Sequence, residues 1–192
     1  TSRAAQAFDL VHCDLWTSPV LSLSGYKYYL VILYDFSHFL WTFPLRLKSD
    51  TFTTLTHFFA WVSTQFCHPV HALQCNNGRE FDNNTSRAFF LTHGVQLRLL
   101  CPYTSPQSGW AERIIRTTTN MICCLLFQAS LPASYSLRFV LVALDSANLN
   151  YPATTKKKRR EYWAEALHTS THLINGLPSK AVSHPTPHFA LY

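Results

Sequence analysis

The sequence lacks the cysteine and histidine spacings that hold a structural zinc ion. None of its six cysteines forms a Cys-x-x-Cys pair, and its ten histidines are scattered without ligand spacing. Most of the cysteines lie in apolar context, so we interpret them as reduced core residues of an intracellular protein. The six are Cys13, Cys67, Cys75, Cys101, Cys123 and Cys124.

A membrane-length apolar run and a secretory signal peptide are also missing. The run at 137–144, broken only by Arg138, is far shorter than the ~20 residues that a span needs. The chain begins at Thr1 with neither a methionine nor a secretory leader. We therefore expect it to be a piece of a longer polyprotein and not a membrane protein.

Charge is scarce and unevenly placed. Charged residues make up 14% of the 192 residues, against 47% hydrophobic and 15% aromatic, which predicts one packed globular domain. The net charge of +6 could favour a polyanionic partner. Five consecutive basic residues at 156–160 supply most of it, and without them 11 basic residues face 10 acidic ones. The basicity is thus local.

One stretch, 105–126, has the pattern of an amphipathic helix. Ser105 can cap it and Pro106 suits its first turn. Apolar residues recur behind them at helical spacing: Ile114, Ile115, Ile122, Leu125 and Leu126. Glu112 and Arg116 lie four residues apart on one face, so a surface ion pair is one interpretation of Glu112.

Two upstream stretches suggest a different role for Glu112. Residues 10–16 form a predicted strand with Asp14 in apolar surroundings, and 72–81 form a strand that runs into the turn Asn76-Asn77-Gly78. Together with Glu112 these stretches resemble the integrase catalytic core of copia-type long-terminal-repeat retrotransposons. That family has an acid on its first strand, a second in an Asp-Asn-Gly-x-Glu-Phe run, and a glutamate thirty-five residues further on. Thirty-five residues separate Asn76 from Glu112 here, but the second acid is an asparagine.

The resemblance implies a ribonuclease H-like α/β fold, with a five-stranded mixed sheet and helices on both faces. The zinc-binding His-His-Cys-Cys module that precedes this core in the family is absent. The sequence predicts strands at 8–16, 26–36, 38–47, 71–75 and 95–100. It predicts helices from Ser49 or Asp50 to 66, at 86–93 before Gly94, at 105–126 and at 163–177, and an extended tail from 179 to 192.

The implied chemistry is metal-dependent 3′-end processing and strand transfer on DNA, with two Mg²⁺ (or Mn²⁺) ions. Asp14 and Glu112 would be the metal ligands, and Asn76 occupies the degenerate catalytic position. An asparagine offers a carbonyl oxygen without charge, so we expect weakened metal binding and trace activity at most. Among nearby acids, Asp35, Glu80 and Asp82 more simply belong to turns or strand ends.

DNA is the implied partner, the nucleus the implied location, and the family allows a homo-oligomer. Gln107, Ser108 and Gly109 match the family's flexible DNA-reaching loop. Arg113 and Arg116 could touch phosphates, or could be ordinary helix charges. Trp110 is unusual at its position and could simply pack. Two alternatives stay open: a catalytically silent nucleic-acid-binding remnant of a retroelement, and a different ribonuclease H-like nuclease.

The segment 136–162 interrupts the family pattern. It holds the apolar run and the basic run, which could be a nuclear address or a phosphate-contacting patch. The interpretation that we favour is an insertion, or translated non-coding sequence, on the surface between two helices. We expect it to be poorly ordered and therefore the first segment that a protease cuts.

Overall fold

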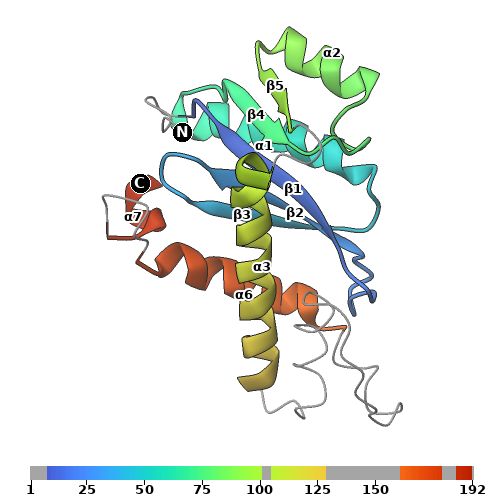
Figure 1. The fold of residues 1–192 in the computed structure, drawn as a ribbon, viewed down its shortest axis with the longest axis vertical. Helices are drawn as coiled ribbons and strands as arrows, with labels where there is room; N and C mark the ends of the chain where they lie inside the picture. Colours follow the sequence, from blue (N-terminus) through green and yellow to red (C-terminus); the bar gives the residue numbers. More distant parts are fainter. Residues whose placement is uncertain (1–7, 101–104, 129–160, 179–184, 192) are drawn as a thin grey trace.

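The five strands form one mixed sheet with β1 at its centre. The computed structural model describes residues 8–100, 105–128, 161–178 and 185–191, without the side chains of 105–109, 127 and 128. The strand order is β3-β2-β1-β4-β5, antiparallel from β3 to β1 and parallel from β1 to β5 (Figure 1). The strands are β1 Val11–Thr17, β2 Tyr28–Tyr34, β3 Leu40–Leu45, β4 Ala72–Cys75 and β5 Gln96–Leu99.

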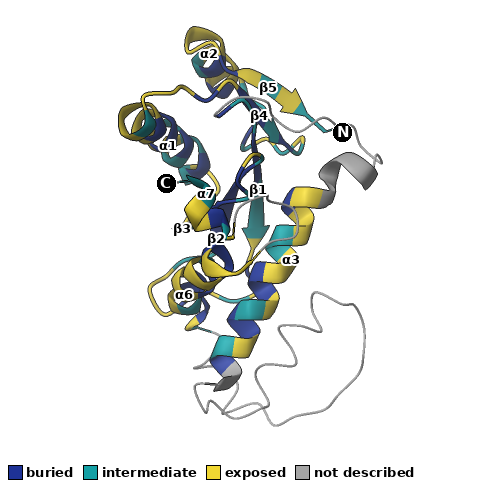
Figure 2. Ribbon diagram, turned by 90° about the vertical axis from the view of Figure 1, so that its left-hand side faces the viewer, coloured by how far each residue is buried: buried dark blue, intermediate teal, exposed yellow. Residues whose placement is uncertain are grey.

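Helices cover both faces of this sheet, as predicted. One hydrophobic cluster lies under α1 (Asp50–Phe66) and α2 (Asn84–Thr92). A second lies between β2, α3 (Ser105–Gln128) and α6 (Trp163–Gly176). Figure 1 shows α3 in front of the sheet with α6 running across it, and Figure 2 shows α1 and α3 with buried residues on the side toward the sheet. The fold is ribonuclease H-like α/β, because sheet order, strand directions and the two helical layers all match.

The first helix shows how local sequence sets the element bounds. Its buried residues, Leu55, Phe58, Phe59 and Val62, follow helical spacing and pack on the sheet. Ser49 makes no capping hydrogen bond; instead the Asp50 carboxylate accepts a hydrogen bond from the Leu47 amide at 3.0 Å. The helix ends at Phe66, and the next residue, Cys67, has a left-handed backbone with φ 55°. None of the described helices is long and apolar enough to cross a membrane.

Two predictions are wrong in part. Residues 187–191 are not extended: they form the short helix α7 (Pro187–Leu191), because Pro187 suits a first helical turn and the Thr186 hydroxyl accepts a hydrogen bond from the Phe189 amide at 3.1 Å. Cys67 and Cys124 are exposed, whereas Cys13, Cys75 and Cys123 are buried, and all five are free thiols. Cys101 and nearly all of the predicted insertion, up to residue 160, lie outside the described residues.

The outer edge of the sheet, β3, is covered by side chains of α6. The Asn175 amide accepts from the backbone N–H of Leu40 and donates to its carbonyl, both at 2.8 Å, as a neighbouring strand would. The hydroxyls of Thr42 and Thr171 lie 2.7 Å apart, and Pro44 has no N–H to offer. These contacts tie the face that carries α3 and α6 to the edge of the sheet.

Candidate functional site

The parallel pairing of β1 with β4 brings Asp14 and Asn76 together. Val11 pairs with Leu73 and His12 with Gln74, so the register carries on to Asp14 and Asn76 two positions later. The Nδ2 of Asn76 donates a hydrogen bond to Oδ1 of Asp14 at 2.8 Å. Residues separated by about sixty positions in the chain are therefore in direct contact, as the resemblance implied.

The orientation of the Asn76 amide is fixed from its other side. Its Oδ1 accepts a hydrogen bond from the backbone N–H of Gly78 at 3.0 Å. An N–H group can only donate, so the oxygen of the amide must face Gly78 and the nitrogen must face Asp14. Where the family has a carboxylate, this chain presents an N–H donor to the first acid.

Gly78 leaves room for the Glu80 side chain in this turn. The Glu80 carboxyl folds back over it, and a Cβ at position 78 would lie 2.6 Å from the Glu80 Cδ. Such contact is closer than real Cβ atoms show, so any larger residue would displace Glu80. The turn after β4 therefore keeps a second carboxylate close to the Asp14–Asn76 pair.

Asp14 lies in an environment that disfavours its charge. Burial raises the pKa of its carboxyl, and the negative charges of Glu80 and Glu112 raise it further. A hydrogen bond from the Leu15 amide to Oδ1, at 2.8 Å, opposes them by favouring the ionised form. Glu80 and Glu112 thus both act on Asp14 electrostatically, and their like charges add to the effect of burial on its pKa.

Glu112 projects from α3, which packs against β1 and β2. Its side chain is 64% exposed, and its Oε1 accepts a hydrogen bond from Nη2 of Arg116 at 3.2 Å. The surface ion pair considered from the sequence is present. Within the residues that the structure describes, no three His, Cys, Asp or Glu side chains are grouped closely enough to hold a metal.

In this arrangement the side chains of Asp14, Asn76 and Glu112 do not fit two magnesium ions. Magnesium requires hard oxygen ligands in near-octahedral geometry, and two such ions need several negative charges around them. Asp14 supplies one carboxylate, whose Oδ1 already accepts two hydrogen bonds, and Asn76 turns its N–H toward it. Glu112 is engaged with Arg116.

Of the three other acids considered from the sequence, two are paired with basic side chains. Asp35 lies 2.9 Å from Nε2 of the buried His12. Asp82 pairs with Arg87, whose hydrogen bonds lower the pKa of the Asp82 carboxyl. Of the three, Glu80 is the one that acts on Asp14.

The predicted DNA-binding residues all lie on α3. Gln107, Ser108 and Gly109 have helical backbone within its first turns, and their side chains are outside the described part. Arg116 pairs with Glu112, whereas the guanidinium of Arg113 lies over the Trp110 ring, 5.2 Å from its centroid.

His38 contacts the Trp110 ring as well, and no sequence pattern predicted this contact. The His38 and Trp110 rings meet edge to face with centroids 4.8 Å apart, across 72 positions of the chain. Neither residue forms a motif with the other, so only the fold reveals the contact.

Known proteins were compared with the chain at the levels of sequence and structure. No family model matches. The chain is 26% identical over all 192 residues to the retrovirus-related Pol polyprotein from transposon RE2 of Arabidopsis thaliana, and covers 11% of that protein. It is 24% identical over 192 residues to the corresponding polyprotein from transposon RE1 of the same plant, again 11% of its length. The resemblance to copia-type retrotransposon polyproteins is confirmed.

A third relative, the retrovirus-related Pol polyprotein from transposon TNT 1-94 of Nicotiana tabacum, is 26% identical over 188 residues. These are 97% of this chain and 12% of the relative. The chain thus spans about a ninth of the length of these copia-type polyproteins. A similar solved structure is the simian T-cell lymphotropic virus intasome in complex with PP2A regulatory subunit B56 gamma, with a TM-score of 0.62 and 14% identity. It matches 97% of this chain and 55% of that one, and at this identity it supports the fold.

Proposed function

We propose that this copia-type domain is an integrase-like core that binds DNA and is impaired in metal-dependent end processing and strand transfer. The observation that carries the proposal is the hydrogen bond from the Asn76 amide to Asp14. DNA is the proposed partner and the nucleus the proposed place of action, with self-association as in the family.

The impairment follows from charge. Two-metal phosphoryl transfer depends on carboxylates that hold two divalent cations a few ångströms apart. Asn76 brings no charge, and the positive end of its N–H dipole faces the place where a cation would meet Asp14. Each 1.4 kcal/mol of lost transition-state stabilisation is about a tenfold loss of rate, so even partial loss of cation binding leaves little activity.

Restoring the carboxylate tests the proposal directly. We expect Asn76→Asp to gain Mg²⁺-dependent nicking or joining of a DNA duplex, while the unchanged chain shows trace activity at most. The matched control is Asn77→Asp, which adds the same charge one residue away on an exposed side chain. Strong Mg²⁺-dependent joining by the unchanged chain would overturn the proposed impairment. Equal gains in both variants would show that Asn76 holds no special position.

A second candidate function is a catalytically silent nucleic-acid-binding domain. The Glu112–Arg116 ion pair favours it, because a glutamate held by an arginine is a weaker candidate for a cation ligand. DNA binding that falls steeply with salt and ignores Mg²⁺ would support it. An inactive but folded Asn76→Asp variant would favour it over an impaired integrase.

A further inference from the structure

We propose that a pocket beside the first turns of α3 binds an unstacked base of single-stranded nucleic acid, with Arg113 on the adjoining phosphate. The pocket holds about 350 Å³ and lies between α3, the turn from β2 to β3, the end of α6 and α7. The proposal rests on the DNA binding proposed above and assigns it a site. The lining of the pocket includes Leu33, His38, Trp110, Arg113, Ile114 and Ile174.

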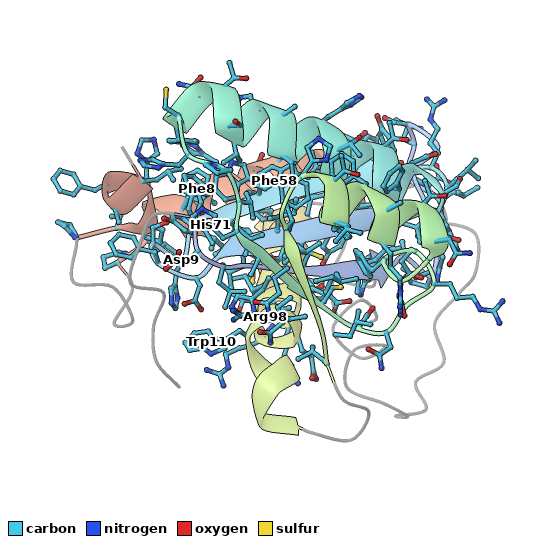
Figure 3. The ribbon with its side chains drawn as sticks, turned by 90° about the horizontal axis from the view of Figure 1, so that it is seen from above. Phe8, Asp9, Phe58, His71, Arg98 and Trp110 are labelled. Atoms are coloured by element: carbon cyan, nitrogen blue, oxygen red, sulfur yellow. The ribbon has the colours of Figure 1, made fainter. Side chains whose placement is uncertain are left out.

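An aromatic wall stands on one side of the pocket. Trp110 keeps 37% of its surface exposed, unlike Trp163, which is fully buried in the core between α6 and β2. Figure 3 shows Trp110 projecting from the flank of α3 at the border of the molecule. The His38 ring meets it at 85°, so the two rings form a corner. A half-exposed tryptophan at such a corner offers the flat surface on which bases stack.

Arg113 adds a positive charge at the same corner. Its guanidinium lies 5.2 Å from the Trp110 ring centroid and forms no ion pair with any carboxylate of the described residues. Arg116 and Arg87, by contrast, are each paired with an acid. An arginine that is held against an aromatic ring and not neutralised suits a phosphate next to a stacked base.

Apart from Thr117, the rest of the pocket lining is apolar, and the volume of the pocket suits a nucleotide. Leu33, Ile114 and Ile174 form its floor. Ligand pockets begin at about 300 Å³, so this one can take a base with its sugar but not a folded peptide segment. An apolar floor, an aromatic wall and one cation match a nucleotide in shape and in charge.

None of Asp14, Asn76 and Glu112 lines the pocket. Trp110, Arg113, Ile114 and Thr117 recur at spacings of three and four, so they share one flank of α3. Glu112 and Arg116 lie on a neighbouring flank of the same helix.

Binding to two DNA probes separates this site from general DNA binding. The probes are an oligothymidylate and a blunt duplex of equal length. Fluorescence anisotropy of each probe measures its binding to the whole chain. We expect Trp110→Ala to weaken oligothymidylate binding about tenfold and to leave duplex binding unchanged, and Arg113→Gln to weaken the oligothymidylate as well. Trp110→Phe, which keeps an aromatic face, should retain most of the affinity.

The matched control is Trp61→Ala, which removes a tryptophan of nearly equal exposure, 39%, from α1. It should change neither affinity, and thermal melts confirm that each variant is folded. Equal losses on both probes, or no loss on either, would overturn the pocket while the DNA-binding proposal stands. An unchanged chain that binds neither probe would overturn both.

Discussion

The side chain of Asn76 makes two hydrogen bonds, and together they define the chemistry of the site. One comes from the Gly78 amide and the other goes to Asp14. An aspartate at this position would keep the first bond and lose the second, leaving two carboxylates in contact. In this chain the amide N–H donates to Asp14 at the place where a second carboxylate would repel it.

Replacing Asp14 by asparagine should stabilise the fold at neutral pH. Both hydrogen bonds to Asp14 end on Oδ1, which an amide carbonyl can supply. The pKa of the Asp14 carboxyl is higher in the folded state than in the unfolded chain. Ionised Asp14 therefore destabilises the fold once the pH rises above the pKa of the unfolded state. The gain in Tm of Asp14→Asn should therefore be largest near pH 7 and vanish in acid, below the unfolded pKa.

Asp82→Asn is the control, and it should change the Tm at neutral pH in the opposite direction. The Arg87 hydrogen bonds lower the pKa of Asp82, so its stabilising effect is present at neutral pH and fades as the pH falls. Thermal melts across pH distinguish the two variants. A lower Tm for Asp14→Asn at neutral pH would contradict the assigned environment of Asp14.

Among the elements, α6 completes the sheet that carries the site. Its Asn175 takes the place of a missing strand on β3, and its Trp163 packs in the core beside Tyr29. An edge strand with free N–H and C=O groups invites pairing with other chains, so this cover also limits self-association through β3.

Asn175→Ala should destabilise the domain by about 2–4 kcal/mol, because it leaves both backbone groups of Leu40 unpaired in a buried place. Denaturant unfolding measures the change, and light scattering should show more association through the opened edge. Asn84→Ala, at an exposed asparagine, is the control. A cost below about 0.5 kcal/mol, the usual range for surface substitutions, would contradict this role.

At the scale of the whole molecule, the periodic segments were the predictable part. The strands at 28–34 and 40–45 and the helix at 50–66 follow from runs of aromatic, β-branched and helically spaced apolar residues. The contact of Asp14 with Asn76 was predicted through the resemblance. The direction of the Asn76 amide was not, because it depends on the Gly78 N–H and on the register of β4 against β1.

Three other features needed the fold. The pairing of His38 with Trp110 joins a turn to a helix far along the chain, which no local pattern encodes. Helix α7 was missed because its prolines suggested extended backbone, although Thr186 followed by Pro187 is also a helix start. Cys67 and Cys124 were assigned to the core because most of the cysteines lie in apolar sequence context, yet the two are exposed, at the end of α1 and on α3.

The central claim is that an amide N–H at position 76 replaces a carboxylate and weakens cation binding at Asp14. Calorimetric titration of Mg²⁺ into the unchanged chain and into Asn76→Asp tests it most directly, with Asn77→Asp as the control. We predict little or no heat of binding for the unchanged chain and the control, and a saturable site in Asn76→Asp. Equal Mg²⁺ affinity in the unchanged chain and in Asn76→Asp would contradict the account.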